Sequence, residues 1–289
     1  MKSQENQKLA ISAWVWTSNP EENNYEFISK ASSLGYQGVE IPTLTGVLDK
    51  VGLMETLSSL SNHVTPIIVG GGSELNDFTS ESYGTRKNAQ NYVKKLIDIS
   101  EHVGSALICG PLYSPVGKLV QISENERKKL VSRVASALGE LSGLLEDTGI
   151  NIALEPLCRY DTFLINTAEQ VGELIEQIGS SNFGILLDTF HMNIEEESLS
   201  RAFEITADKT FHIQVCENNR GIPGTGQINW QEFKNSLRNI KYNKFVSVES
   251  FTPYDIRFSE MMKMWRKFSK TQDLFASQSF TFLRKLFDE

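Results

Sequence analysis

The second half of the chain contains the four apolar runs Ile152-Ala-Leu-Glu155, Gly184-Ile-Leu-Leu-Asp188, Thr210-Phe-His-Ile213 and Val246-Ser-Val-Glu249. Each run carries one ionisable side chain at or near its end, namely Glu155, Asp188, His212 or Glu249. The intervals between these residues are 33, 24 and 37 positions. Each interval is about the length of one strand-plus-helix unit of a (β/α)8 barrel, which needs ~250 residues for eight units. Because barrel strands end around one mouth, residues this far apart in sequence can converge on one divalent metal ion.

Strand and helix patterns alternate along the whole chain. Short runs rich in Ile, Val and Leu predict eight strands, at residues 9–16, 38–41, 64–69, 106–109, 150–155, 183–188, 210–215 and 245–249. Such runs are typical of parallel strands that helices cover. The intervening segments have helical periodicity; residues 123–145 predict one helix, and residues 167–179 begin with a capping-box pattern and end at a glycine. These alternations predict a single-domain (β/α)8 TIM barrel over residues 1–289.

Composition and local motifs disfavour several other classes. The first predicted strand is not followed by a Gly-x-Gly-x-x-Gly turn, which argues against a dinucleotide-binding open sheet. The net charge of −8, from 28 basic and 36 acidic residues, argues against nucleic acid as a partner. The apolar stretch at 9–16 is far shorter than the ~20 residues of a membrane span. Three cysteines without a close-spaced metal motif or a secretory signal predict reduced thiols and a cytoplasmic protein.

Three carboxylates and one imidazole at successive strand ends predict a metal centre. Alternate side chains of a strand share a face, so all four can point into the barrel. Taken singly, an acid just past a strand can be only the N-cap of the next helix. A buried cluster of three carboxylates, however, needs a cation to offset its charge. Oxygen ligands with one imidazole suit Mn²⁺ best, with Co²⁺ or Mg²⁺ as alternatives and Zn²⁺ less suited.

Longer segments around these residues resemble a known family. In the second half they are Leu154-Glu-Pro-Leu-Cys-Arg-Tyr-Asp-Thr162, Leu187-Asp-Thr-Phe-His-Met-Asn-Ile194, His212-Ile-Gln-Val-Cys-Glu-Asn-Asn-Arg-Gly-Ile-Pro-Gly-Thr-Gly226 and Val248-Glu-Ser-Phe251. Elsewhere they are Gly110-Pro-Leu-Tyr-Ser-Pro-Val-Gly117 and Trp265-Arg266. Together they are similar to the ketose 3-epimerases, which include D-tagatose and D-allulose (psicose) 3-epimerase and belong to the xylose-isomerase-like barrels. The likeness covers most of the chain and is densest from 150 to 251.

The resemblance implies a role for each matching residue. The family's metal ligands match Glu155, Asp188, His212 and Glu249. Its acid/base pair matches Glu155 and Glu249, and its substrate-binding residues match Asp161, His191 and Arg220. Three positions depart from the family pattern: Asp161 replaces a usual Glu, Cys158 a usual Asn and Asn219 a frequent Asp. These departures bear on which sugar is preferred. The resemblance also implies a homodimer or homotetramer that binds a small sugar.

The chemistry of these residues agrees with epimerisation. Inverting carbon 3 of a ketose requires a base that removes its proton and an acid that returns one from the opposite side. Two carboxylates that face each other across the sugar can do both, through an enediolate that a metal ion would stabilise. We therefore expect a metal-dependent enzyme of the isomerase class that acts on a free ketohexose or ketopentose.

Alternatives remain open at this stage. An aldose–ketose or keto-polyol isomerase could use the same barrel, because a fold does not determine its reaction. A multi-zinc nuclease of related fold is disfavoured by the acidic charge and by only four histidines. A sugar-binding barrel without activity is disfavoured by the full ligand set. His191 could instead be a loop histidine bonded to the backbone, and Arg220 could pair only with Glu217. Trp14 and Trp16 could line a sugar pocket or pack in the core.

Overall fold

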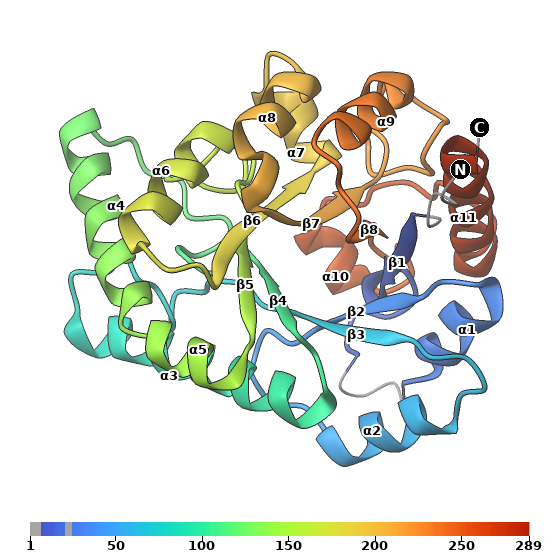
Figure 1. Cartoon of the computed structure of the whole chain (residues 1–289), viewed down its shortest axis with the longest axis horizontal. Helices are drawn as coiled ribbons and strands as arrows, with labels where there is room; N and C mark the ends of the chain where they lie inside the picture. The colour runs from blue at the N-terminus through green and yellow to red at the C-terminus, as the bar shows by residue number, and fades with distance from the viewer. Residues whose placement is uncertain (1–6, 21–24, 289) are drawn as a thin grey trace.

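The chain closes into a barrel of parallel strands. The computed structural model describes residues 7–20 and 25–288. Its strands are β1 (Lys8–Ser12), β2 (Gly38–Pro42), β3 (Thr65–Val69), β4 (Leu107–Gly110), β5 (Asn151–Leu154), β6 (Phe183–Asp188), β7 (Thr210–Val215) and β8 (Phe245–Val248). Each strand pairs with the next along the chain, and β8 pairs with β1 to close the barrel (Figure 1). The predicted (β/α)8 TIM barrel is confirmed.

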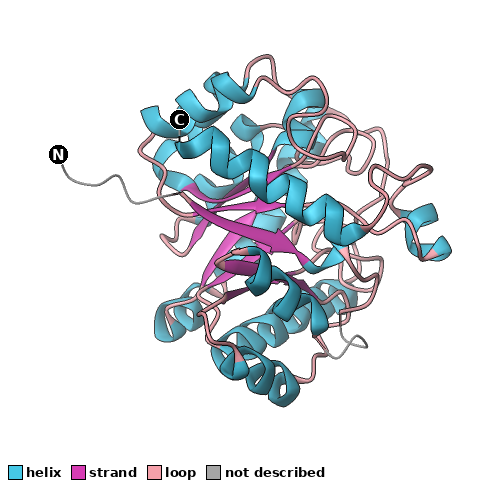
Figure 2. Cartoon of the chain, turned by 90° about the vertical axis from the view of Figure 1, so that its right-hand side faces the viewer, coloured by secondary structure: helices cyan, strands magenta, loops and turns pink. Residues whose placement is uncertain are grey.

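Helices connect the strands and surround the barrel (Figure 2). They are α1 (Glu26–Leu34), α2 (Lys50–Ser59), α3 (Tyr83–Val103), α4 (Glu124–Gly139), α5 (Ser142–Thr148), α6 (Ala168–Ile178), α7 (Thr189–Glu195), α8 (Leu199–Thr206), α9 (Trp230–Asn239), α10 (Ile256–Met261) and α11 (Gln272–Asp288). Two short 3-10 turns, η1 (Ala13–Val15) and η2 (Ala207–Lys209), complete the fold.

Local hydrogen bonds explain where two of the predicted helices begin and end. Thr167 accepts the amide of Gln170 at the start of α6, and Gly179 ends that helix in the left-handed conformation, as the capping pattern predicts. The single helix predicted over 123–145 is instead α4 followed by α5. The break follows Gly139, a residue of low helix propensity, and the chain tightens there into a hydrogen bond from Leu141 N–H to the carbonyl of residue 138.

The first strand is shorter than its apolar run predicts. It ends at Ser12, whose side chain accepts the amide of Trp14 and begins η1. The two tryptophans therefore do not share a strand face. The Trp14 ring packs against Phe251, with centroids 5.5 Å apart. The Trp16 indole donates to Asp273 on α11 at 2.7 Å. The hydrogen bond from the Trp14 amide to the Ser12 hydroxyl thus ends the strand, despite the β-propensity of the residues that follow.

Two apolar clusters result from the alternation of side chains along the strands. The larger one lies between the strands and the helices, and includes Ile11, Phe27 and Phe233. The smaller one fills the barrel interior and consists of Ala10, Ile67, Val69, Cys109, Ala153 and Leu186. The same interior also buries polar side chains, namely Glu40, His212, Gln214 and Ser247. A buried polar group of this kind requires partners, so the interior is a hydrogen-bonded site as well as a core.

Gly110 at the end of β4 provides a test of the barrel's close packing. Its φ is +122°, and an added Cβ would lie 2.1 Å from the carbonyl oxygen of Gly70. We expect Gly110→Ala to lower the free energy of unfolding by at least about 1–3 kcal/mol, the cost of one such strained residue. The matched control is Gly172→Ala in α6, where nothing lies within 4 Å of the added carbon. This control should raise stability by about 0.4–1 kcal/mol. Urea denaturation measures the free energy of unfolding of both variants, and equal changes in the two would contradict the prediction.

Candidate functional site

The acidic residues meet where the strands end. Asp188 is the last residue of β6, while Glu155 and Glu249 directly follow β5 and β8. Each is nine-tenths or more buried. The Glu155 backbone N–H donates to the carbonyl of Gly110, and that of Glu249 donates to the carbonyl of Val215, so both continue the pattern of the neighbouring strand. The barrel therefore brings three carboxylates together at one mouth.

Arg220 joins two of these carboxylates. Its Nη1 donates to Asp188 Oδ2 at 2.5 Å and to Glu249 Oε2 at 2.8 Å. The guanidinium lies over the Phe190 ring, 4.1 Å from its centroid, and 5.1 Å from that of Phe251. The backbone of Arg220 is left-handed, with φ +65°. A non-glycine residue in this conformation is unusual and marks a position that its surroundings constrain. The side chain thus pairs with the site acids, and the predicted alternative of a lone ion pair with Glu217 does not describe it.

His191 presents a hydrogen-bond donor to the same space. Its Nδ1 accepts the backbone N–H of Cys158 at 3.0 Å, so the ring proton lies on Nε2. Burial, with Arg220 beside it, holds the pKa of His191 well below its usual range, and the ring is neutral. Nε2 lies 3.7 Å from Glu155 Oε1 and 3.8 Å from Asp188 Oδ2. Arg220 Nη2 is 3.1 Å from Nε2, but both atoms carry hydrogens, so this contact is not a hydrogen bond.

With its three carboxyl groups ionised, the site would hold more negative than positive charge. Burial raises the pKa of Glu155 well above its usual range, raises that of Asp188, and raises that of Glu249 to about 8. Arg220 lowers all three, but less than burial raises them. Within residues 7–20 and 25–288 no other Lys or Arg is hydrogen-bonded to these carboxylates. A bound divalent cation would offset the remaining charge, so the donor set fits a metal ion.

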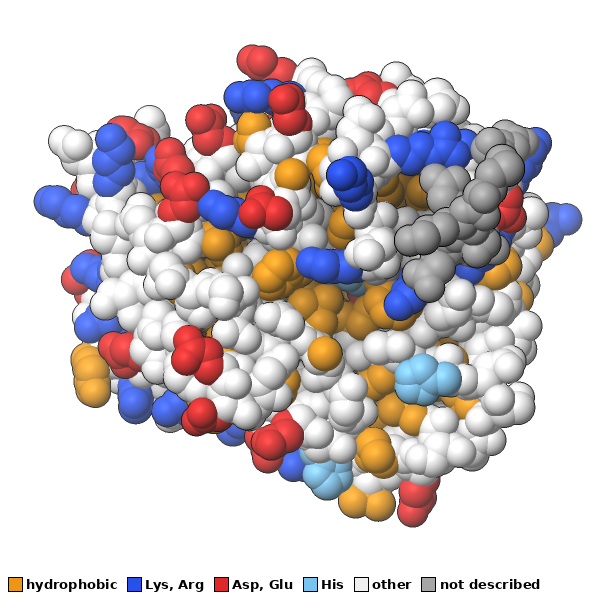
Figure 3. All heavy atoms as spheres, viewed as in Figure 1, with side chains coloured by type: hydrophobic (Ala, Val, Ile, Leu, Met, Phe, Trp, Pro, Cys, Tyr) orange, Lys and Arg blue, Asp and Glu red, His pale blue; other side chains and the backbone are white. Residues whose placement is uncertain are grey.

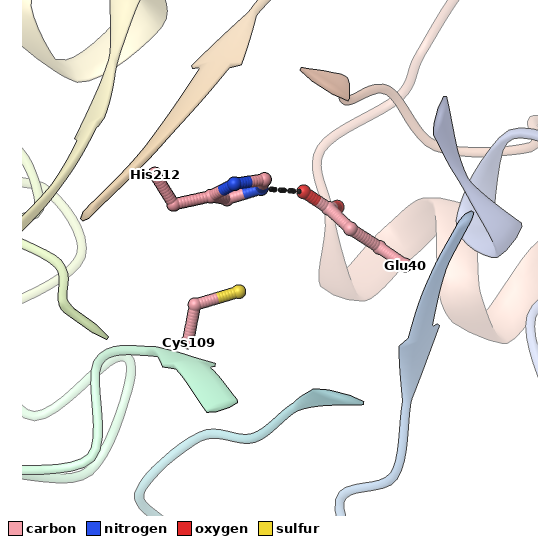
Figure 4. Close-up of side chains that lie close together, drawn as sticks. All are labelled: Glu40, Cys109 and His212. Atoms are coloured by element: carbon pink, nitrogen blue, oxygen red, sulfur yellow. Dashed lines mark hydrogen bonds and ion pairs between the residues drawn. The ribbon is translucent and has the colours of Figure 1, made fainter. Parts of the chain in front are cut away.

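His212 lies below this group rather than in it. Its Nε2 bonds Glu40 Oε1 at 2.7 Å, and both side chains are fully buried (Figure 4). With Cys109 they form a cluster whose candidate ligand atoms lie within 4.8 Å of one another. Glu155, Asp188 and His191 form a separate cluster by the same measure. Of the predicted ligands, Glu155 and Asp188 thus share one cluster, Glu249 is linked to Asp188 through Arg220, and His212 belongs to the cluster with Glu40 and Cys109.

Asp161 lies at the rim of the site. Its side chain is 40 % exposed, and its Oδ2 accepts the thiol of Cys158 at 3.2 Å. The same oxygen is 4.0 Å from His191 Nδ1. A carboxylate in this position can contact solvent and a ligand of the site at the same time, as expected for a residue at the edge of a substrate pocket.

A cavity of about 350 Å³ adjoins the mouth. Its wall includes the apolar side chains of Trp14, Pro42, Leu44, Phe258 and Met261 and the polar side chains of Ser18, Asp255 and Arg257. It borders the site through Trp14, which packs on Phe251, the ring beneath Arg220. An apolar wall with a few polar groups is usual for a small-molecule site. Trp14 therefore lines a cavity and also packs on Phe251 and Phe258, and its contact with a sugar stays a prediction.

Sequence reasoning missed two polar residues that organise the site. Gln214 donates from Nε2 to Glu40 Oε2 and to Glu249 Oε1, both at 3.0 Å. Glu217 is fully buried and accepts the amide of Gly224 and the indole N–H of Trp230, each at 2.7 Å. Because side chains alternate along β7, Gln214 shares the inward face with His212. The metal-site prediction named the histidine because its side chain is ionisable. No local signal distinguished Glu217 from a surface acid.

Comparisons with known proteins agree with this geometry. A sequence model of the family described as xylose isomerase-like TIM barrel matches residues 28–271. The ketose 3-epimerase of Arthrobacter globiformis is 27% identical over 281 residues, which cover 96% of each chain. The D-psicose 3-epimerase of Ruminiclostridium cellulolyticum is 29% identical and covers 89% of this chain and 88% of its own. The crystal structure of D-allulose 3-epimerase from Methylomonas sp. with D-allulose superposes with a TM-score of 0.90, at 25% identity and 97% coverage of each chain.

These matches confirm the predicted resemblance to ketose 3-epimerases. They also confirm the predicted enzyme class, the isomerases. Among the helices of residues 7–20 and 25–288, none combines the length and apolar character needed to cross a membrane. On the face in Figure 3, acidic and basic side chains are interspersed.

Glu217 allows a test of how the loop that carries Arg220 is held. Its carboxylate faces only N–H donors, so Glu217→Gln would turn one acceptor into a donor that points at other donors. We expect the free energy of unfolding to fall by about 1–3 kcal/mol, the cost of an unsatisfied buried group. Glu204→Gln, at an exposed carboxylate on α8, should change it by less than about 0.5 kcal/mol. Thermal and urea denaturation measure both. Equal free energies of unfolding for the two variants would mean that Glu217 does not anchor the loop.

Proposed function

The chain belongs to the xylose isomerase-like TIM barrel family, and from this we propose that it inverts carbon 3 of a free ketose, with Glu155 and Glu249 as the acid/base pair. The observation that carries the proposal is the buried group of three carboxylates at the barrel mouth, two of which Arg220 joins and which the Nε2–H of His191 faces. The relatives named as ketose and D-psicose 3-epimerases support the reaction class.

A free sugar suits this site better than a phosphorylated one. Arg220 is already shared by Asp188 and Glu249. A phosphate group usually requires several donors or a positive cluster of its own. The related D-allulose 3-epimerase binds D-allulose, which is an unphosphorylated ketohexose. The substrate that we propose is accordingly a free ketohexose or ketopentose.

The acid/base roles of Glu155 and Glu249 rest on their burial. A carboxyl group whose pKa lies near the working pH can accept a proton in one half of the reaction and return it in the other. Burial moves the pKa of both groups toward that range. We assign one carboxyl group to each face of the substrate's carbon 3. Proton removal on one face and proton return on the other would then invert the configuration.

The neighbouring donors would bind and orient the sugar. Arg220 and the Nε2–H of His191 can donate to the oxygens on either side of the reacting carbon, which would hold that carbon between the two acids. The nearby rim residue Asp161 would contact the end of the sugar and contribute to the choice of substrate. The apolar wall at Trp14 would cover the rest of the sugar and exclude water.

We further propose that the site holds a divalent ion, with Mn²⁺ as the first choice. Glu155, Asp188 and Glu249 would be its ligands, and the excess of buried negative charge supports this set. Such an ion supplies a Lewis acid that stabilises charge developing on the sugar oxygens. The contact of His212 with Glu40 speaks against His212 as the fourth ligand. Assembly as a homodimer or homotetramer and a cytoplasmic location stay predictions.

Metal removal tests the cofactor. Dialysis against a chelator should abolish epimerisation, and Mn²⁺ should restore it, because the carboxylates need a cation to act together. The same addition should raise the melting temperature, since an ion that binds only the folded state stabilises it. Elemental analysis accompanies each assay. Full turnover by protein that contains no metal would exclude the metal-dependent mechanism.

Deuterium exchange tests the acid/base pair and the reaction together. In D₂O, wild-type protein should place deuterium at carbon 3 of the ketose that it epimerises, whereas an aldose–ketose isomerase would place it elsewhere and give an aldose. Glu155→Gln and Glu249→Gln should each lower net epimerisation by ~10²-fold or more. Each variant should still exchange the proton of the one epimer whose face its remaining acid serves.

A single-base mechanism predicts a different pattern. One variant would then be inactive in both assays and the other nearly normal, which would overturn the two-acid assignment and leave the metal site in place. Metal content is measured first in both variants, because loss of the ion would lower both activities for another reason.

A further inference from the structure

Strand register decides which β7 side chain lies level with Asp188. Asp188 on β6 pairs with Gln214, and Gln214 pairs with Ser247, two residues before Glu249, which directly follows β8. His212 pairs instead with Leu186, one inward-facing step earlier. Two residues of a strand span about 6–7 Å. Gln214 is therefore at the level of Asp188, and His212 lies in the layer beneath.

The hydrogen bonds of Gln214 use its side-chain nitrogen and leave its side-chain oxygen without a partner among the described residues. Its side-chain nitrogen faces two carboxylate oxygens, from Glu40 and Glu249, and only an NH₂ group can satisfy both. The amide orientation follows from this requirement. Its Oε1 is fully buried and has no hydrogen-bond partner within the part of the chain that the structure describes. An unsatisfied buried acceptor is costly, so this oxygen requires a ligand.

His212 is bonded through one of its ring nitrogens in the deeper layer. Its Nε2 contacts Glu40, and the ring points across the barrel toward that carboxylate (Figure 4). Its Nδ1 has no partner among the described residues, but it belongs to the layer beneath Asp188. Glu40 thus receives one bond from His212 through Oε1 and one from Gln214 through Oε2. Moving His212 up to the ion would break the first of these bonds and leave a buried carboxylate short of a donor.

We propose that Gln214, in place of His212, completes the metal-binding set with Glu155, Asp188 and Glu249. The inference rests on the proposed function and specifies its metal site. All four donors are then oxygens, which favours a hard ion such as Mg²⁺ or Mn²⁺ over Zn²⁺. Arg220 contacts one oxygen each of Asp188 and Glu249. A carboxylate has about four acceptor positions, so it can serve a guanidinium and an ion together.

Pulsed EPR of the Mn²⁺-loaded wild-type protein tests the ligand directly. A coordinated imidazole nitrogen gives a characteristic ¹⁴N modulation of the Mn²⁺ signal. We expect no such modulation in the wild-type protein and expect it to appear in Gln214→His. A wild-type ¹⁴N modulation that disappears in His212→Leu would overturn the proposal. This comparison begins with the unmodified protein and so does not depend on a variant that folds.

Metal affinity in matched variants provides a second, independent readout. Gln214→Leu and His212→Leu each remove one hydrogen bond to Glu40, so damage transmitted through Glu40 would be similar in both. Gln214→Leu also removes the bond to Glu249, and the EPR comparison separates that loss from the loss of direct coordination. By calorimetry, Gln214→Leu should weaken Mn²⁺ binding about tenfold or more, and His212→Leu less than about threefold. Gln214→His should raise the affinity for Zn²⁺ relative to Mg²⁺ about tenfold or more, because imidazole is the softer donor. Equal losses in the two leucine variants would overturn the proposal.

The outcomes separate this inference from the proposed function. Absence of any Mn²⁺ binding by the wild-type protein would overturn both the Gln214 ligand and the metal-dependent mechanism. Mn²⁺ binding with the expected spectrum, but no epimerisation of any ketose, would overturn the proposed reaction alone. Circular dichroism and melting temperature confirm that each variant is folded before its affinity is compared.

Discussion

The burial of several carboxylates inside one barrel is the constraint on which the rest of the structure depends. Asp188 and Glu249 share a single guanidinium, and that sharing determines how the loop after β7 must run. Arg220 reaches both acids from a left-handed backbone. Glu217 makes this conformation stable, because its buried carboxylate gathers the donors of the same loop. The rings of Phe190 and Phe251, whose centroids lie 4.1 and 5.1 Å from the guanidinium, restrict it further.

A second set of contacts links the mouth to the interior. Glu249, Gln214, Glu40 and His212 form a continuous chain of hydrogen bonds across two layers of the barrel. Buried networks of this kind strengthen when every member is satisfied and are costly when one is not. Two buried atoms of this chain have no partner among the described residues: Gln214 Oε1, which lies at the level of Asp188, and His212 Nδ1 in the layer beneath. The network therefore positions Glu249 from below and leaves a single oxygen for a ligand.

The function follows from this site more than from the barrel. Many reactions occur on (β/α)8 barrels, so the fold by itself selects none of them. The relatives narrow the chemistry to sugar epimerisation, and the paired acids with a neutral histidine donor suit proton transfer at a carbon beside a carbonyl. Details particular to this chain, such as Asp161 at the rim and Gln214 level with Asp188, would then adjust substrate and metal preference.

Local sequence patterns determined the eight strands, the starts of α4 and α6 and the three acids at strand ends, because period, capping and turn chemistry act over a few residues. They could not show that β1 stops at Ser12 or that one predicted helix divides into α4 and α5. Above all, a period of two makes His212 and Gln214 equivalent, since both face inward. Only the stagger between neighbouring strands decides which of them is level with Asp188. That stagger, and the bond between His212 and Glu40 across 172 residues, exist only once the barrel has closed.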